Sequence, residues 1–165
     1  MSSPTTNFLQ SSSFLLSIPK FQNVQFYGQS VAIPNISLNN ATVGTPFVNI
    51  PLAGDKADFA PLTVNFIIDA NMANYLEIFN WIKSIGFIDD NADFTHYTGK
   101  NKSQTLGEQD ISLMIMSSKN NLIKTILFHD SIPINLSTIE LTSQDTTTNY
   151  TYGSVTFAYS YYDFV

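Results

Sequence analysis

The side chains of this chain that could do chemistry gather in two short stretches. In the first, His96 follows Asp93 by three positions and lies near Asp89 and Asp90, all within a polar segment. Several carboxylates with one imidazole are a ligand set for a hard or borderline cation. The segment lacks the alternating oxygen ligands and the closing glutamate of an EF-hand loop. We interpret these charges as a solvated loop and expect no metal site.

The second stretch is His129-Asp130, at the end of an expected strand. Neighbouring strand residues point to opposite faces of a sheet, so this carboxylate is poorly placed to orient this imidazole. Gly54-Asp55-Lys56 lacks the remaining glycines and the Gly-Lys-Ser/Thr ending of a phosphate-binding loop, and it predicts a tight turn instead. No nucleophile elbow, HExxH sequence or dinucleotide fingerprint is present. We therefore expect no catalytic residue and no cofactor, and predict that the chain is not an enzyme.

The composition indicates a folded chain with few charges. Of its 165 residues, 44% are hydrophobic and only 12% are charged, so the chain can build a core and wholesale disorder is excluded. Its polar positions are filled by Asn, Ser and Thr. Neutral polar surface can be buried against a partner without desolvating an ion, which favours a protein that assembles. A coding bias towards Asn, Ile and Lys would give the same composition.

The charge balance argues against nucleic-acid binding. The chain has seven Lys, no Arg and a net charge of −6, whereas nucleic-acid binders neutralise phosphates with Lys and Arg clusters. The absence of Cys excludes a disulfide framework and a cysteine nucleophile. No signal-peptide pattern begins the chain, and no apolar run approaches the ~18 residues that cross a bilayer. We expect neither export by a signal peptide nor membrane insertion.

The hydrophobic periodicity predicts a mainly β domain with one helix. We expect residues 1–12 to form a flexible arm and residues 13–165 to form a single domain. A hairpin turn is expected at 118–121, and a long polar connection at 87–109. The expected strands are 14–18, 23–27, 29–33, 62–68, 111–116, 122–128, 134–141 and 155–162.

The single helical pattern runs from about residue 72 to Gly86. Asp69 or Asn71 is expected to cap its start, and Gly86 to end it. Apolar residues at helical spacing predict a core-facing stripe, with polar residues on the wet side. The expected stripe is Met72, Tyr75, Leu76, Phe79 and Ile82, and the expected wet positions are Asn74, Glu77, Asn80, Lys83 and Ser84.

The segment 35–51 is the least regular. Asn39-Asn40 and Gly44-Thr45-Pro46 are turn signals, and Pro46 and Pro51 argue against a central strand. We interpret this segment as an excursion between two core strands. It is either an ordinary surface loop or a segment that reaches a neighbouring subunit.

Three blocks of the chain resemble, in order and spacing, the tail-tube proteins of contractile-tailed bacteriophages. Residues 13–34 contain the turn Phe26-Tyr27-Gly28-Gln29. Residues 50–81 contain Ala53-Gly54-Asp55-Lys56 before a strand and a helix with an aromatic-rich end. Residues 126–164 contain Pro133-Ile134-Asn135-Leu136 and end in Tyr162-Asp163-Phe164. Their ordered combination is more specific than any single motif.

This resemblance implies a β-barrel or rolled β-sandwich of the tail-tube type, flanked by one helix. It also implies a virion structural protein, made in the host bacterial cytoplasm, whose hexameric rings build or cap the DNA conduit of a contractile tail. The implied partners are further copies of the chain, sheath, baseplate or neck proteins, and DNA that passes through without sequence-specific binding. The longer 87–109 connection and the Pro-richer N-terminal block leave open a tube-body, baseplate-end or head-end position. The implied subunit-interface candidates are Asn39, Asn40, Thr42, Val43, Phe47, Gly54, Asp55 and Lys56.

Three alternatives remain at this point. The tube of a bacterial contractile secretion system would share the same pattern. A carbohydrate-binding β-sandwich module would use exposed aromatic residues such as Tyr150, Tyr152 and Tyr162. A loop-based hydrolase would use Asp89, Asp93 and His96.

Overall fold

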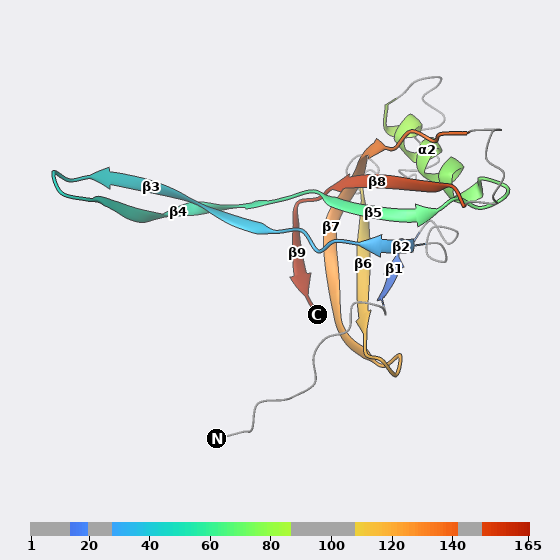
Figure 1. Cartoon of the computed structure of the whole chain (residues 1–165), viewed down its shortest axis with the longest axis horizontal. Coiled ribbons are helices and arrows are strands. Elements are labelled where there is room, and N and C mark those ends of the chain that lie inside the picture. Colours follow the sequence, from blue (N-terminus) through green and yellow to red (C-terminus); the bar gives the residue numbers. More distant parts are fainter. Residues whose placement is uncertain (1–13, 20–27, 87–107, 142–149) are drawn as a thin grey trace.

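The computed structural model describes residues 14–19, 28–86, 108–141 and 150–165. Over these residues the chain forms nine strands and one helix (Figure 1). In chain order they are β1 (Phe14–Ser17), β2 (Gly28–Val31), β3 (Ile36–Gly44), β4 (Asn49–Phe59), β5 (Leu62–Ile67), α2 (Ala73–Ile85), β6 (Gln109–Met116), β7 (Leu122–Leu136), β8 (Tyr152–Ala158) and β9 (Tyr161–Phe164).

Seven of these strands form one rolled sheet. Its order is β1-β6-β7-β8-β5-β2, and β9 pairs with β7 beside this path. All of the pairings are antiparallel. Among the described residues β1 and β2 end the path without pairing to each other, so the sheet does not close into a barrel. The mainly β fold with one helix is confirmed.

The sheet bends where β7 changes partners. Its first part pairs with β6 and β9, and its last part, from Ile132, pairs with β8. An extra residue at the change leaves Asp130 with a φ of 54°, and bulges of this kind bend a strand and increase its twist. Opposite this point the extended strand is interrupted between β8 and β9, and the Ser160 N–H donates to the His129 carbonyl at 3.0 Å.

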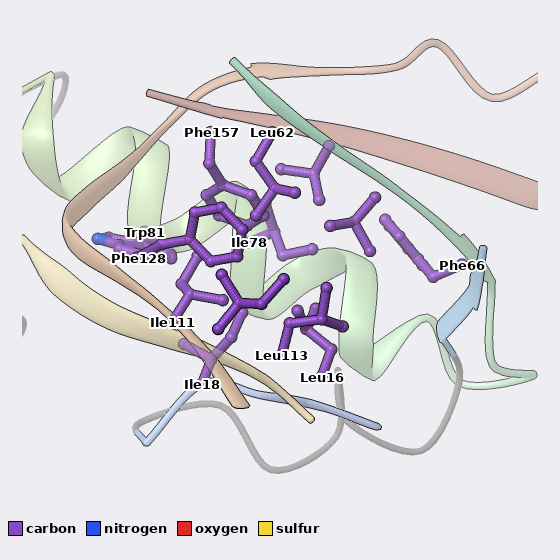
Figure 2. Packing of buried hydrophobic residues seen from close by; sticks show 13 residues of the cluster. Leu16, Ile18, Leu62, Phe66, Ile78, Trp81, Ile111, Leu113, Phe128 and Phe157 are labelled. Atoms are coloured by element: carbon purple, nitrogen blue, oxygen red, sulfur yellow. The ribbon is translucent and has the colours of Figure 1, made fainter. Parts of the chain in front are cut away.

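The core lies between the rolled sheet and α2 (Figure 2). Side chains at alternate strand positions point inwards, as the period of two requires; on β5 these are Leu62, Val64 and Phe66. Trp81 of α2 packs against Phe157 of β8, with ring centroids 5.9 Å apart. The buried cluster is Leu16, Ile18, Leu62, Val64, Phe66, Ile78, Trp81, Ile111, Leu113, Ile126, Phe128, Val155 and Phe157.

The predicted inner face of α2 is confirmed at Tyr75 and Ile82, which pack against the core, and is wrong at its other three positions. The buried positions are Asn74, Ile78, Trp81 and Ser84, whereas Leu76 and Phe79 of the expected stripe are exposed, as is Met72. The Asn74 side chain holds the helix in this orientation about its axis. The Asn74 amide donates to the Ile67 carbonyl at 2.8 Å and accepts from the Asp69 N–H at 3.3 Å, which ties this face of the helix to the end of β5.

The predicted cap of α2 is also wrong. Met72 occupies the N-cap position in a left-handed conformation, with a φ of 55° and no side-chain cap hydrogen bond. The Asp69 carboxylate instead accepts from the neighbouring Ala70 N–H at 2.8 Å. At the other end Gly86 caps the helix, as predicted, through its N–H to the Ile82 carbonyl at 3.0 Å.

The strand predictions agree with the structure where the alternation is regular. The strands predicted at 14–18, 62–68 and 111–116 and the turn at 118–121 are confirmed, with Asn120 at a φ of 57°, and the prediction at 29–33 overlaps β2. The strands predicted at 122–128 and 134–141 are wrong as separate elements, because β7 runs through Leu136. The strand predicted at 155–162 divides into β8 and β9. The predicted strand at 23–27, the arm at 1–12 and nearly all of the 87–109 connection lie outside the described residues.

The described part of the chain contains no helix with the length and apolar character needed to cross a membrane.

Replacing the buried indole tests this core. Trp81→Ala removes a side chain that is 1% exposed, and we expect the free energy of unfolding to fall by about 3–5 kcal/mol. Denaturant unfolding followed by far-UV circular dichroism measures this, since Trp81 is the only Trp. Phe79→Ala is the matched control on the same helix, and its 47% exposure predicts a loss below about 1 kcal/mol. Equal losses for the two variants would contradict the observed helix face.

Candidate assembly surfaces

The β3–β4 hairpin, called the arm below, stands apart from the rest of the sheet. Its two strands form a separate two-stranded sheet, and Figure 1 shows it extending well beyond the body of the domain. Every residue of β3 and most of β4 are exposed. An isolated two-stranded hairpin is marginally stable in water. The arm therefore gains stability if another surface covers it.

The arm exposes a series of apolar side chains. Phe47, between the strands, is 98% exposed, the highest value among the large hydrophobic residues described. The arm carries no charged residue from Ile36 to Gly54, so contact with this part of it desolvates no ion. Its charged residues are Asp55, Lys56 and Asp58, nearer its base. The exposed apolar residues of the arm are Ile36, Leu38, Val43, Phe47, Val48, Ile50 and Leu52.

A bulge interrupts the arm midway. Leu38 pairs with Ala57 and Asn40 with Ala53, so Asn39 lies opposite the three residues Gly54 to Lys56. A Cβ atom at Gly54 would overlap the Asn39 backbone carbonyl, so this position needs glycine. The Asn39 amide also donates to the Asp58 carboxylate at 2.8 Å across the two strands. The tight turn predicted at Gly54-Asp55-Lys56 is wrong, because these residues form a bulged part of β4.

Two tyrosines hold the base of the arm. The Tyr159 hydroxyl donates to the Ala60 carbonyl at 2.6 Å, just after β4, and the Tyr162 hydroxyl donates to the Pro34 carbonyl at 3.3 Å, just before β3. Phe59 packs edge-on against both rings, with centroids 6.2 and 5.4 Å away. The sequence does not reveal this anchor, because the interruption between β8 and β9 that places the two tyrosines is not visible in an alternating pattern.

The structure brings the eight predicted interface residues onto the arm. Asn39, Asn40, Gly54, Asp55 and Lys56 gather at the bulge. Thr42, Val43 and Phe47 lie nearer its tip. Seven of the eight are exposed, and Gly54 is half-buried. The excursion predicted at 35–51 is thus an extended hairpin rather than an irregular loop. Pro51 is tolerated because each arm strand has one unpaired edge. The interface role of these residues stays a prediction.

His129 has carboxylate neighbours that the sequence did not indicate. Its Nδ1 lies 3.9 Å from Asp110 and its Nε2 3.6 Å from Asp163, and its ring stacks on Tyr161 at 4.4 Å. The backbone N–H of the adjacent Asp130 donates to the Asp110 carboxylate at 3.2 Å. These distances are longer than hydrogen bonds and are not those of an oriented catalytic pair.

A fourth acidic side chain, Glu108, lies near this group. Burial, and then the charge of Asp130, raise the pKa of the Glu108 carboxyl. Even so, no group of three His, Asp or Glu side chains among the described residues is arranged to hold a metal ion. The other candidate metal-binding segment lies outside the described residues. It contains Asp89, Asp90, Asp93 and His96.

The three tyrosines of the carbohydrate-binding alternative do not share a surface. Tyr162 is packed between Phe59 and Phe128. Tyr152 lines a shallow polar hollow beside β2, whereas Tyr150 lines an apolar one at the end of β5. A sugar-stacking platform needs its rings side by side, and these three do not provide one.

The fold and the arm define a class of protein: a mainly β domain that carries one helix and projects a separate hairpin whose outer part is apolar and uncharged. The family model described as "Phage tail tube protein" matches residues 4–165 of the sequence. The chain belongs to the phage tail tube protein family.

Individual relatives agree with this assignment. The tail tube terminator protein of Enterobacteria phage T4 is 25% identical over 163 residues, which cover 94% of this chain and 88% of the relative. A chain of the PVC sheath–tube complex, from an extracellular contractile injection system, has the same fold, with a TM-score of 0.67 at 13% identity over 99% of each chain. A chain of the tube-terminating cap of the anti-feeding prophage has a TM-score of 0.64 at 10% identity, over 100% of this chain and 95% of that one.

The arm bulge generates one prediction. Gly54→Ala forces a methyl group onto the Asn39 carbonyl, and we expect the arm to lose about 1 kcal/mol or more of local stability. Cross-strand nuclear Overhauser effects between Leu38 and Ala57 report this loss. Gly44→Ala is the control, because the nearest atom to its Cβ is the Asn49 side-chain oxygen at 3.7 Å. Intact cross-strand signals in Gly54→Ala would contradict the observed register.

The anchor generates a prediction for alkaline pH. Burial, and then the neighbouring Tyr162, raise the pKa of the Tyr159 phenol to about 12, against about 10 in an unfolded chain. The folded state therefore favours the neutral phenol, and its contribution to stability is complete below pH 10 and lost as the pH rises towards 12. Unfolding measured from pH 8 to 12 should show a smaller alkaline loss for Tyr159→Phe than for the exposed control Tyr150→Phe. Identical pH profiles would contradict the anchor.

Proposed function

We propose that this chain is a structural subunit of a contractile phage tail, forming hexameric rings that build or cap the DNA conduit. The carrying observation is the arm, a long hairpin with exposed apolar side chains that pairs with no other strand of its own described fold. Family membership supplies the context in which such an arm has a use.

Open sheet edges support a ring. An unpaired strand edge is a template for pairing with another chain, and proteins normally cover it. Here β1 and β2 end the described sheet, so neighbours in a closed ring would cover these edges. Heterologous contacts of this kind close into a ring when the rotation between copies allows it.

The charge of the chain suits a conduit. With seven Lys, no Arg and a net charge of −6, the protein has little to hold a phosphate backbone. DNA would pass without sequence-specific binding, and no cofactor takes part in this function.

The end of the tube is the position within the tail that the relatives favour. The T4 relative is a tail tube terminator, and chains from a tube-terminating cap and from a sheath/tube terminator share the fold. In this position the ring would contact tube subunits and sheath or neck proteins. A tube-body ring is the competing position, and the purified protein distinguishes the two: a terminator stops at single rings, whereas a body subunit stacks into tubes.

Assembly of the purified full chain tests the proposal. Native mass spectrometry should give a species of six copies of the 18.4 kDa chain, and negative-stain microscopy should show rings. Protein that stays monomeric at high concentration would overturn the proposal.

Shortening the arm tests its role. Asn40 and Ala53 are paired, so residues 41–52 can be replaced by Asn-Gly, which favours a two-residue hairpin turn. We expect a folded monomer with unchanged circular dichroism in the core and no rings, because the covering surface is gone. The matched control replaces 117–121 with Asn-Gly in the β6–β7 hairpin and should still assemble. Rings of the arm-shortened chain would show that the arm is dispensable.

A further inference from the structure

An apolar cavity of about 460 Å³ lies beyond the end of β5. Its lining on one side is Ile67, at the end of β5, with Ile68 and Met72 from the segment before α2. On the other side it is lined by Ile139, Leu141 and Tyr150, which lie between β7 and β8 in the chain. Leu141 and Tyr150 are 82% and 72% exposed. After Phe47 they are among the most exposed apolar side chains described. One molecule therefore has two exposed apolar surfaces, one on the arm and one around this cavity.

The cavity and the arm lie at opposite ends of the long axis. Figure 1 shows the arm projecting from one side of the body, while β5 runs in the other direction towards the start of α2. Phe47 at the tip therefore cannot reach the cavity of its own chain. A second copy placed further along this axis can present its cavity to the tip.

We propose that Phe47 of one copy inserts into the cavity between Ile68, Ile139 and Tyr150 of a neighbouring copy. The contact deepens the proposed function, on which it rests, by naming the surface that receives the arm. It is heterologous, since a tip on one copy meets a cavity on the next, and such contacts repeat around a ring or along a stack.

Size and polarity agree with this occupant. An apolar cavity of about 150 Å³ is enough to hold benzene, so a cavity of about 460 Å³ accepts a phenyl ring together with flanking atoms of the tip. The tip is uncharged from Val43 to Ile50. The charged residue of the lining, Asp69, directs its carboxylate to the Ala70 N–H at 2.8 Å, so an entering ring meets mainly carbon.

Photo-crosslinking of the purified full chain tests the contact. Phe47 is replaced by p-benzoylphenylalanine, which keeps an aromatic ring at the tip, and the protein is mixed with an equal amount of isotope-labelled wild-type chain. We expect crosslinks between labelled and unlabelled copies at residues 139–141 or 150–151. Crosslinks between copies that fall elsewhere would overturn the inference.

Matched variants provide a second readout. Phe47→Ser and Tyr150→Ser should each weaken self-association at least tenfold in sedimentation, while Phe47→Leu should weaken it less. Leu122→Ser is the control. Leu122 is an exposed apolar residue too, at 60%, but it lies on the β6–β7 hairpin, away from the proposed contact. Circular dichroism confirms that each variant is folded, and equal association of all four variants would refute the contact.

The inference and the proposed function fail in different ways. Six-membered rings whose crosslinks avoid the cavity would refute the Phe47 contact and leave the ring intact. A chain that is monomeric at every concentration would refute both.

Discussion

The fold depends on one strand that serves two parts of a sheet. β7 pairs with β6 and β9 in its first part and with β8 in its last. The bulge at Asp130 lies where the partners change. Because the sheet bends there, side chains from both of its parts point into the same core. The helix α2 covers the side of that core that the sheet leaves open. Without the bend, the alternating apolar faces of these strands would lie in one flat sheet with no interior.

The same bend holds the base of the arm. Opposite the bulge, the break between β8 and β9 turns Tyr159 and Tyr162 towards the two ends of the arm, where their hydroxyls bond the Ala60 and Pro34 carbonyls. A marginal two-stranded hairpin is thereby fixed at its base while its tip remains uncovered. Core and arm are coupled through this corner, so the direction in which Phe47 projects is set by packing in the body.

Sequence patterns located the regular elements and missed the irregular ones. The alternation at 62–68 predicted β5 because every second residue is apolar and buried. The predicted face of α2 is right at Tyr75 and Ile82 and wrong at Leu76 and Phe79. Leu76 and Phe79 are as hydrophobic as the true core residues, and hydrophobicity does not reveal that Asn74 bonds to the end of β5. The eight arm residues came from the family resemblance, and their placement on a hairpin came from the structure. Neither His129 with its carboxylate neighbours nor the tyrosine anchor was predictable, because their members are far apart in the chain.

The sequence by itself determined that this chain folds as mainly β with one helix, carries few charges and has the block order of a tail-tube protein. The first two of these properties depend on composition and local periodicity, and the third is a resemblance between sequences. All three are present in the chain before it folds. Only the tertiary structure decided where the sheet bends, which face of α2 is buried, and that the segment 36–59 is a projecting hairpin. Such features depend on hydrogen bonds and ring contacts between residues up to 128 positions apart, and only the folded chain brings those residues together.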